Sequence, residues 1–263
     1  MSSPQRSLFD SLLAPWDYLA LVAGFLIWGV GGLIYTGVSA VLYPILPRRA
    51  GSRLGQCVMT GLFQFFVTYL RCTGRFRLDL SELDRLRGQG GLILAPNHPS
   101  LLDAVWVIAR LSNVTCIMKA KIWDNIFLGG GARLSGYIRN DSPNSMVKQG
   151  ADALRSGLNL LVFPEGTRTV AGRAVNPFKG GFALIAKSAR APVQTIFLET
   201  KQQFLTKERG PAARPDFPYT LKVRLGERFE IGEDESVKDF VARLEDYYRG
   251  QLAVLGGGGR EYE

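Results

Sequence analysis

A single histidine lies five residues before an aspartate in the segment APNHPSLLDAVWVIARL, residues 95–111. His98 is the only histidine in the chain of 263 residues. A carboxylate at one imidazole nitrogen fixes the tautomer and leaves the other nitrogen free to accept a proton. An unperturbed histidine pKa of about 6.5 suits that work near neutral pH. His98 and Asp103 are therefore candidates for a general base and its orienting partner.

A structural interpretation of the same residues competes with the catalytic one. Ser100 and Asp103 fit a capping box, S-x-x-D, at the start of an expected helix over 101–111. In this interpretation His98 is an ordinary loop residue. Both interpretations place the histidine on a loop and the aspartate in the first helical turn, where the two side chains can meet.

A second polar segment, LVFPEGTRTV, covers residues 161–170. Gly166 lets backbone amides approach an oxyanion, and Arg168 supplies a planar fork suited to phosphate. Glu165 can orient that arginine or a substrate hydroxyl. The alternative is a charged turn in which Glu165 and Arg168 pair with each other. Because the chain has no G-x-S-x-G elbow, we expect the nucleophile to be the substrate's own hydroxyl.

Apolar strand-like segments alternate with amphipathic helical ones after Arg71. The expected strands cover 75–80, 92–97, 114–119, 158–163, 193–199 and 220–231, and the expected helices cover 101–111, 144–156, 179–190 and 236–254. Ser236 is the expected N-cap of the last helix. The alternation predicts an α/β fold with a mixed, largely parallel sheet flanked by helices. Both polar segments follow strands, and we expect them to face one crevice at the carboxyl edge of the sheet.

The stretch from residue 18 to 47 contains no charged residue. As one helix it would exceed the hydrocarbon thickness of a bilayer, about 30 Å. We expect either a tilted spanning helix or a helical hairpin broken near Gly29, Gly31 and Gly32. Residues 54–70 are expected to form a helix at the interface or packed on the domain. The predicted domains are a membrane-anchoring region over 1–70, an α/β domain over 71–255 and a flexible tail over 256–263.

The chain carries 32 basic and 23 acidic residues, a net charge of +9. This charge favours anionic partners such as lipid head groups, phosphorylated substrates or nucleic acid, but no nucleic-acid-binding motif is present. Three cysteines without CxxC spacing argue against a disulfide framework and a zinc site. Arg48, Arg49 and Arg53 follow the apolar run, which places its C-terminal side in the cytoplasm.

With both motifs in view, the chain resembles the lysophospholipid acyltransferase family, typified by 1-acyl-glycerol-3-phosphate acyltransferase. The first signature, NHxSxxD, matches Asn97 to Asp103, and the third, FPEGTR, matches Phe163 to Arg168. A looser second signature resembles residues 118–121 and 136–139, and a proline-containing fourth resembles 191–193. The resemblance covers roughly 75 to 230. One departure is the segment WDNIFLGGGARLSG, 123–136, where the family usually has a proline and aromatic residues.

The resemblance implies acyl transfer from acyl-CoA or acyl-carrier protein to a lipid hydroxyl, with 1-acyl-glycerol-3-phosphate as acceptor and phosphatidic acid as product. His98 would be the general base and Asp103 its partner. The residues implied in substrate binding are Asn97, Ser100, Lys119, Arg139, Glu165, Gly166, Thr167 and Arg168. No metal or bound cofactor is implied. The implied partners are the bilayer, a lysophospholipid and the acyl donor, at the bacterial inner (cytoplasmic) membrane with the catalytic domain facing the cytoplasm.

Two alternatives remain open at this point. One keeps the chemistry and changes the acceptor to lyso-ornithine lipid, another lysophospholipid or an aryl-polyene pigment intermediate. The other is a membrane lipid-binding scaffold without catalytic activity. The intact spacing of His98 and Asp103 and the intact FPEGTR segment argue against the scaffold, since an inactive site need retain neither.

Overall fold

The computed structural model describes residues 14–126, 129–202, 204–207 and 217–257. In chain order the elements are α2 (Ala14–Ile45), α3 (Arg48–Cys72), β1 (Phe76–Asp79), the 3-10 helix η1 (Ser81–Leu86), β2 (Ile93–Pro96), α4 (Asp103–Ile108), β3 (Val114–Lys119), α5 (Ala120–Trp123), α6 (Gly129–Leu134), β4 (Ile138–Asn140), α7 (Pro143–Arg155), β5 (Asn159–Leu161), α8 (Gly181–Ala189), β6 (Val193–Glu199), β7 (Tyr219–Phe229) and α9 (Val237–Gly257).

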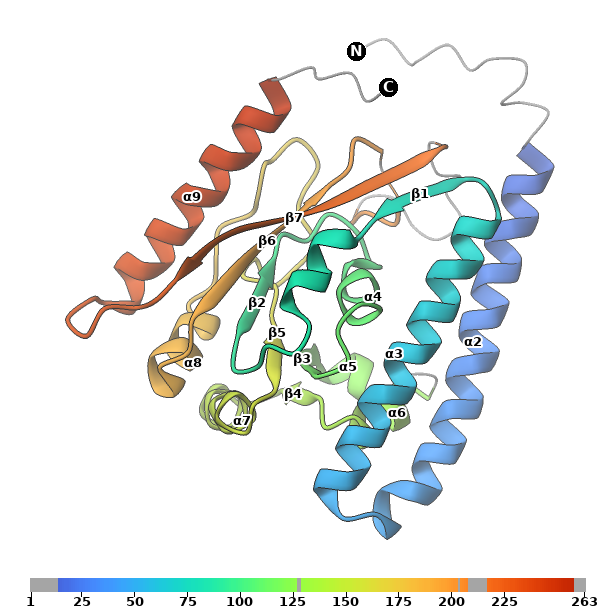
Figure 1. Ribbon diagram of the computed structural model, residues 1–263, viewed down its shortest axis with the longest axis horizontal. Helices are drawn as coiled ribbons and strands as arrows, with labels where there is room; N and C mark the ends of the chain where they lie inside the picture. The colour runs from blue at the N-terminus through green and yellow to red at the C-terminus, as the bar shows by residue number, and fades with distance from the viewer. Residues whose placement is uncertain (1–13, 127–128, 203, 208–216, 258–263) are drawn as a thin grey trace.

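The strands form one seven-stranded sheet in the order β1-β7-β6-β2-β5-β3-β4. Neighbouring strands run parallel except for β6 and β7, which run antiparallel. This arrangement confirms the predicted mixed, largely parallel sheet. All four residues of β2 are buried, as expected of a central strand covered on both faces. Figure 1 shows helices α7, α8 and α9 on one side of the sheet and α2, α3 and α4 on the other.

Most expected elements form with boundaries shifted by one to three residues, but several short ones were missed. Strand β4 has three residues, and α5 and α6 have four and six. Elements of this length carry too few apolar positions to show a period. Helix α4 begins at Asp103 and not at the expected residue 101. Helix α9 continues through Gly257, so the expected tail over 256–263 begins within a helix, and residues 258–263 lie outside the described part.

Helix α2 runs without interruption through Gly29, Gly31 and Gly32. Of the two expected forms, the hairpin broken at these glycines is therefore wrong, and the stretch forms one helix. A glycine in a helix costs only about 1 kcal/mol relative to alanine, and contacts along the helix offset that cost. The chain turns instead at Pro47, which precedes the first residue of α3. Helices α2 and α3 then run side by side as a long pair at one edge of the molecule (Figure 1).

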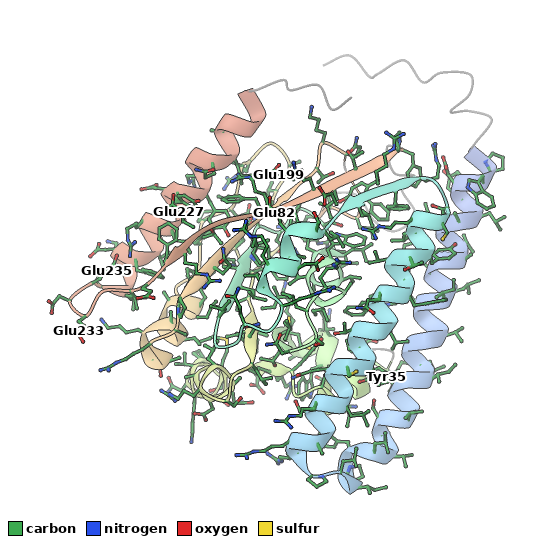
Figure 2. All side chains as sticks on the ribbon, in the orientation of Figure 1. Tyr35, Glu82, Glu199, Glu227, Glu233 and Glu235 are labelled. Atoms are coloured by element: carbon green, nitrogen blue, oxygen red, sulfur yellow. The ribbon has the colours of Figure 1, made fainter. Side chains whose placement is uncertain are left out.

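The helix pair is docked tightly on the α/β domain through the segment that departs from the family pattern. A Cβ atom on Gly131 would lie 2.3 Å from the ring of Tyr35, so only glycine fits there. The Tyr35 hydroxyl donates to the carbonyl of Gly55 at 2.9 Å, and Gln56 donates to the carbonyl of Ser135 at 3.1 Å. Figure 2 labels Tyr35 where α2 and α3 lie together. Residues 129–136 therefore serve as a packing surface for the helix pair.

The other end of α2 is attached to the domain as well. The Asp17 carboxylate is buried and accepts from the Arg75 guanidinium at 2.6 Å. The indole of Trp16 donates to the carbonyl of Thr73 at 3.1 Å. Contacts at Trp16 and at Thr36 thus hold α2 in place at both ends of the stretch between these residues.

Candidate active site

The histidine and aspartate of the first motif meet at the carboxyl edge of the sheet. Strand β2 ends at Pro96, so the next two residues leave the sheet at that edge. The Nδ1 atom of His98 lies 2.9 Å from Oδ2 of Asp103. Asp103 is fully buried, and the His98 side chain is 17% exposed. Within the described part of the chain, no group bonds Nε2 of His98. That nitrogen is therefore the one available to a substrate hydroxyl.

Asp103 also fixes the turn that precedes α4, whose N-cap is Leu102. Its Oδ2 accepts from the backbone N–H of Ser100 at 2.7 Å, and the Ser100 hydroxyl accepts from the N–H of Leu102 at 3.3 Å. One carboxylate oxygen thus contacts both the imidazole and the Ser100 N–H, so the structural and the catalytic interpretations do not exclude each other. Burial raises the pKa of the Asp103 carboxyl, and the hydrogen bond from His98 opposes that rise.

The side chain of Asn97 joins β2 to β6. Its carbonyl oxygen accepts from the N–H of Leu198 at 2.7 Å, and its amide nitrogen donates to the Leu198 carbonyl at 3.2 Å. Asn97 is only 5% exposed. The amide thus extends the strand pairing past Pro96 and sets the exit direction of the histidine loop.

The FPEGTR segment lies directly against His98. The carboxylate of Glu165 accepts from the backbone N–H of His98 at 2.9 Å and from that of Asn176 at 2.8 Å. The Thr169 hydroxyl donates to the same carboxylate. Glu165 is 1% exposed, and a carboxylate buried this deeply needs such donors. The Glu165 carboxylate therefore binds these three donors and does not orient Arg168, which was one of the expected roles.

The arginine of this segment holds a neighbouring loop instead. Arg168 donates from Nη1 to the carbonyls of Leu205 and Thr206, at 2.8 and 2.7 Å. Gly166 has a φ of +66°, and its N–H closes a turn onto the carbonyl of Phe163 at 3.0 Å. That amide is therefore already used within the turn. Thr167 is half-buried.

Lys119 and Arg139 lie further along the same edge of the sheet. Arg139 is on β4, three strands from β2, which is about 14 Å at the usual strand spacing. Its guanidinium forms ion pairs with Asp124 at 3.0 Å and Asp141 at 3.2 Å. In the strand register Lys119 aligns with Asn140, so Lys119 and Arg139 alternate between faces of the sheet. The fold therefore brings the first and third motifs together and leaves these two cations apart from them.

Comparison with known proteins finds similarity to acyltransferases. The family model described as Acyltransferase matches residues 77–199. A 1-acyl-sn-glycerol-3-phosphate acyltransferase from Cocos nucifera is 32% identical over 161 residues, which cover 58% of this chain and 51% of the relative. The enzyme of that name from Pseudomonas aeruginosa is 27% identical over 215 residues, 80% of this chain and 77% of the relative. Residues 77–199 thus match the acyltransferase family model, and the chain is similar to named acyltransferases over up to 80% of its length.

The fold of a solved acyltransferase is similar as well. The crystal structure of the 1-acyl-sn-glycerophosphate (LPA) acyltransferase from Thermotoga maritima superposes with a TM-score of 0.66 at 17% identity, covering 93% of this chain and 98% of that one. The match to the coconut relative spans about half of that protein's length. The prediction of an acyltransferase is thus confirmed at the level of the family, and the acceptor and donor belong to the proposal below.

Three residues that hold the site together were missed from sequence. Thr169 and Asn176 satisfy the buried carboxylate of Glu165, and Phe163 lies flat against the His98 ring. Thr169 and Phe163 were within the quoted motif but had no assigned role. Asn176 lies eleven residues from Glu165, and no local pattern marks it as a partner.

Proposed function

We propose that this acyltransferase transfers a fatty acyl group to the free hydroxyl of 1-acyl-glycerol-3-phosphate to give phosphatidic acid. The observation that carries the proposal is the His98–Asp103 pair, whose Nε2 has no hydrogen-bond partner in the described part of the chain, within the segment that matches the acyltransferase family model. Relatives from a plant and a bacterium bear the name of this activity. The donor is a thioester, either acyl-CoA or acyl-carrier protein, and no bound cofactor is required.

The chemistry follows from the geometry of the pair. Asp103 accepts a hydrogen bond from Nδ1–H, so Nε2 carries the lone pair. Nε2 removes the proton of the acceptor hydroxyl as its oxygen attacks the thioester carbonyl. The tetrahedral intermediate then expels the thiolate, and the imidazolium returns the proton to the leaving sulfur. Asp103 stabilises the imidazolium between these two steps.

We further propose that α2 lies along one leaflet of a membrane and does not cross it. By length and composition, Pro15–Ile45 is the single helix in the described part of the chain that could span, yet only 22% of its most apolar window is buried. Its exposed residues form a stripe, the α2 apolar face: Leu19, Val22, Leu26, Val30, Leu33, Ile34, Val38, Val41 and Ile45. Such a face is too large to leave in water.

The opposite side of α2 packs on α3 near Gly24 and on the domain near Asp17 and Thr36. A perpendicular crossing would carry those contacts into the hydrocarbon, which supports the in-plane arrangement over the spanning one. Arg48 and Arg49 at the turn favour an anionic leaflet. We therefore propose a position at the cytoplasmic face of the bacterial inner membrane.

A second acceptor class follows from the surroundings of Arg139. Its guanidinium lies between the carboxylates of Asp124 and Asp141, so this cluster of three groups is net negative. A zwitterionic lysophospholipid carries a phosphate for the arginine and an ammonium group for a carboxylate, and this match requires its head group to extend along the sheet edge from His98 toward β4. The chemistry at His98 would be unchanged.

An acyl-transfer assay tests the proposal on membranes that contain the wild type or His98→Ala. Radiolabelled acyl-CoA and acyl-carrier protein are offered with lysophosphatidic acid and with zwitterionic lyso-lipids. Histidine-dependent phosphatidic acid is the expected product. Histidine-dependent acylation of a zwitterionic lyso-lipid alone would favour the second acceptor class. Equal turnover by wild type and His98→Ala would exclude His98 as the base.

A further inference from the structure

The FPEGTR segment holds the His98 residue from several directions. The His98 N–H donates to Glu165 at 2.9 Å, and the His98 carbonyl accepts from the N–H of Thr169 at 2.8 Å. Glu165 is itself held by Thr169 and by the N–H of Asn176. Both peptide groups of the histidine are thereby fixed to the segment. These contacts turn Glu165 inward to the backbone of the base, away from a substrate.

The same segment covers one face of the imidazole. The ring of Phe163 stacks on the ring of His98 with centroids 3.8 Å apart and planes inclined by 17°. Phe163 is partly buried and packs against the core, so its own ring is restrained. A flat aromatic face in contact with the imidazole excludes water from that side.

The hydrogen bond to Asp103 alone does not fix the direction of Nε2. A bond at Nδ1 restrains one atom of the ring, and the ring can still tilt about the line from its attachment point through that atom. Stacking against Phe163 removes the tilt because a tilted ring would collide with the phenyl plane. An aromatic face also attracts the imidazolium that forms during proton transfer.

We propose that Phe163 is a positioning residue for the general base, whose ring fixes the imidazole plane so that Nε2 stays aimed at the acceptor hydroxyl. This inference rests on the proposed function. It assigns part of the FPEGTR segment to the base, in addition to the substrate contacts that the family resemblance implies. A small misplacement of a reacting group can cost about a hundredfold in rate. Loss of the Phe163 ring should therefore lower the rate by a measurable factor.

Kinetics of two variants separate an aromatic requirement from a need for apolar volume. Phe163→Leu keeps apolar volume and removes the ring, and Phe163→Tyr keeps the ring. We expect Phe163→Leu to lower kcat by about tenfold to a hundredfold with KM for the acceptor changed less than about twofold. Phe163→Tyr should stay within about threefold of wild type. Phe182→Leu, in the core of α8 away from His98, is the matched control for loss of a core ring and should keep wild-type kcat.

Magnetic resonance of the imidazole gives a readout that does not depend on turnover. Because His98 is the only histidine, its ring protons give signals that need no further assignment. The stack should shift these signals upfield through the ring current, Phe163→Leu should abolish the shift, and Phe163→Tyr should retain it. Unshifted signals in the wild type, or equal kcat losses in both Phe163 variants, would overturn the proposal. If no His98-dependent product forms while the His98 signals show the expected ring-current shifts, the proposed function is refuted but the stacking of Phe163 on His98 is confirmed.

Discussion

At the scale of single residues, Asp103 combines a local structural role with the catalytic role proposed for it. One of its oxygens accepts from the His98 imidazole and from the Ser100 backbone. The carboxylate can do both because the first helical turn directs it back toward the loop that precedes it. Because Asp103 is buried, its carboxylate needs these hydrogen bonds: a buried carboxylate without them would lower the stability of the fold.

Asp103→Asn separates the two roles. The amide oxygen can still accept from Ser100, whereas the charge that stabilises the imidazolium is lost. We expect kcat to fall by about 10²- to 10⁴-fold, with a change of about 1 kcal/mol or less in the free energy of unfolding. Acyl-transfer kinetics and thermal unfolding measure the two effects.

Ser236→Ala is the matched control for a lost cap. The Ser236 hydroxyl accepts from the N–H of Asp239 at 3.1 Å at the start of α9, as expected of an N-cap. Its loss should cost about 1 kcal/mol in stability and leave kcat unchanged. A large loss of stability with full activity in Asp103→Asn would restrict that residue to capping.

At the scale of elements, glycines on one helix have opposite roles. A Cβ atom on Gly55 would lie 2.6 Å from the backbone nitrogen of Ser135, so α3 and the end of α6 approach as closely as glycine allows. Gly61, on the same helix, has nothing within 4 Å of its Cβ position. The first glycine is required by packing and the second is not.

Substitution of Gly55 and of Gly61 by alanine should change the stability of the protein in opposite directions. Gly55→Ala should destabilise the protein by about 1–3 kcal/mol because the backbones must move apart. Gly61→Ala should stabilise it by up to about 1 kcal/mol, because alanine has the higher helix propensity and loses less entropy on folding. Thermal unfolding in detergent compares the two. Equal shifts of the same sign would contradict the close contact between α3 and α6.

At the scale of the whole molecule, one edge of the sheet carries both polar motifs, and the α2–α3 pair, which we propose binds the membrane, lies on one flank. The carboxyl edge carries the histidine and FPEGTR loops, and the α2–α3 pair covers one flank (Figure 1). Because the pair is fixed to the domain at both ends, through Asp17–Arg75 and Gln56–Ser135, membrane binding would set the orientation of the site as well as its location.

The α2 apolar face makes this arrangement testable. Replacing Leu26, Val30 and Ile34 together by asparagine should reduce binding to anionic phospholipid vesicles at least about a hundredfold, at about 1.5–3 kcal/mol for each buried side chain. Flotation measures the bound fraction. Leu184→Asn, at a leucine of α8 that is 46% exposed, is the control and should bind like the wild type. Unchanged flotation of the triple variant would place the membrane contact elsewhere.

Sequence alone predicts the two polar motifs and most of the sheet of this protein. The spacing of His98 and Asp103, the FPEGTR segment and the alternation of strands and helices are local properties, and local periodicity and capping chemistry suffice to recognise them. Tertiary structure alone decides which groups meet across the sheet. Glu165 binds the backbone of His98, Phe163 covers its ring, and the glycines near Gly131 receive α2, because partners far apart in the chain are brought together only by strand order and packing.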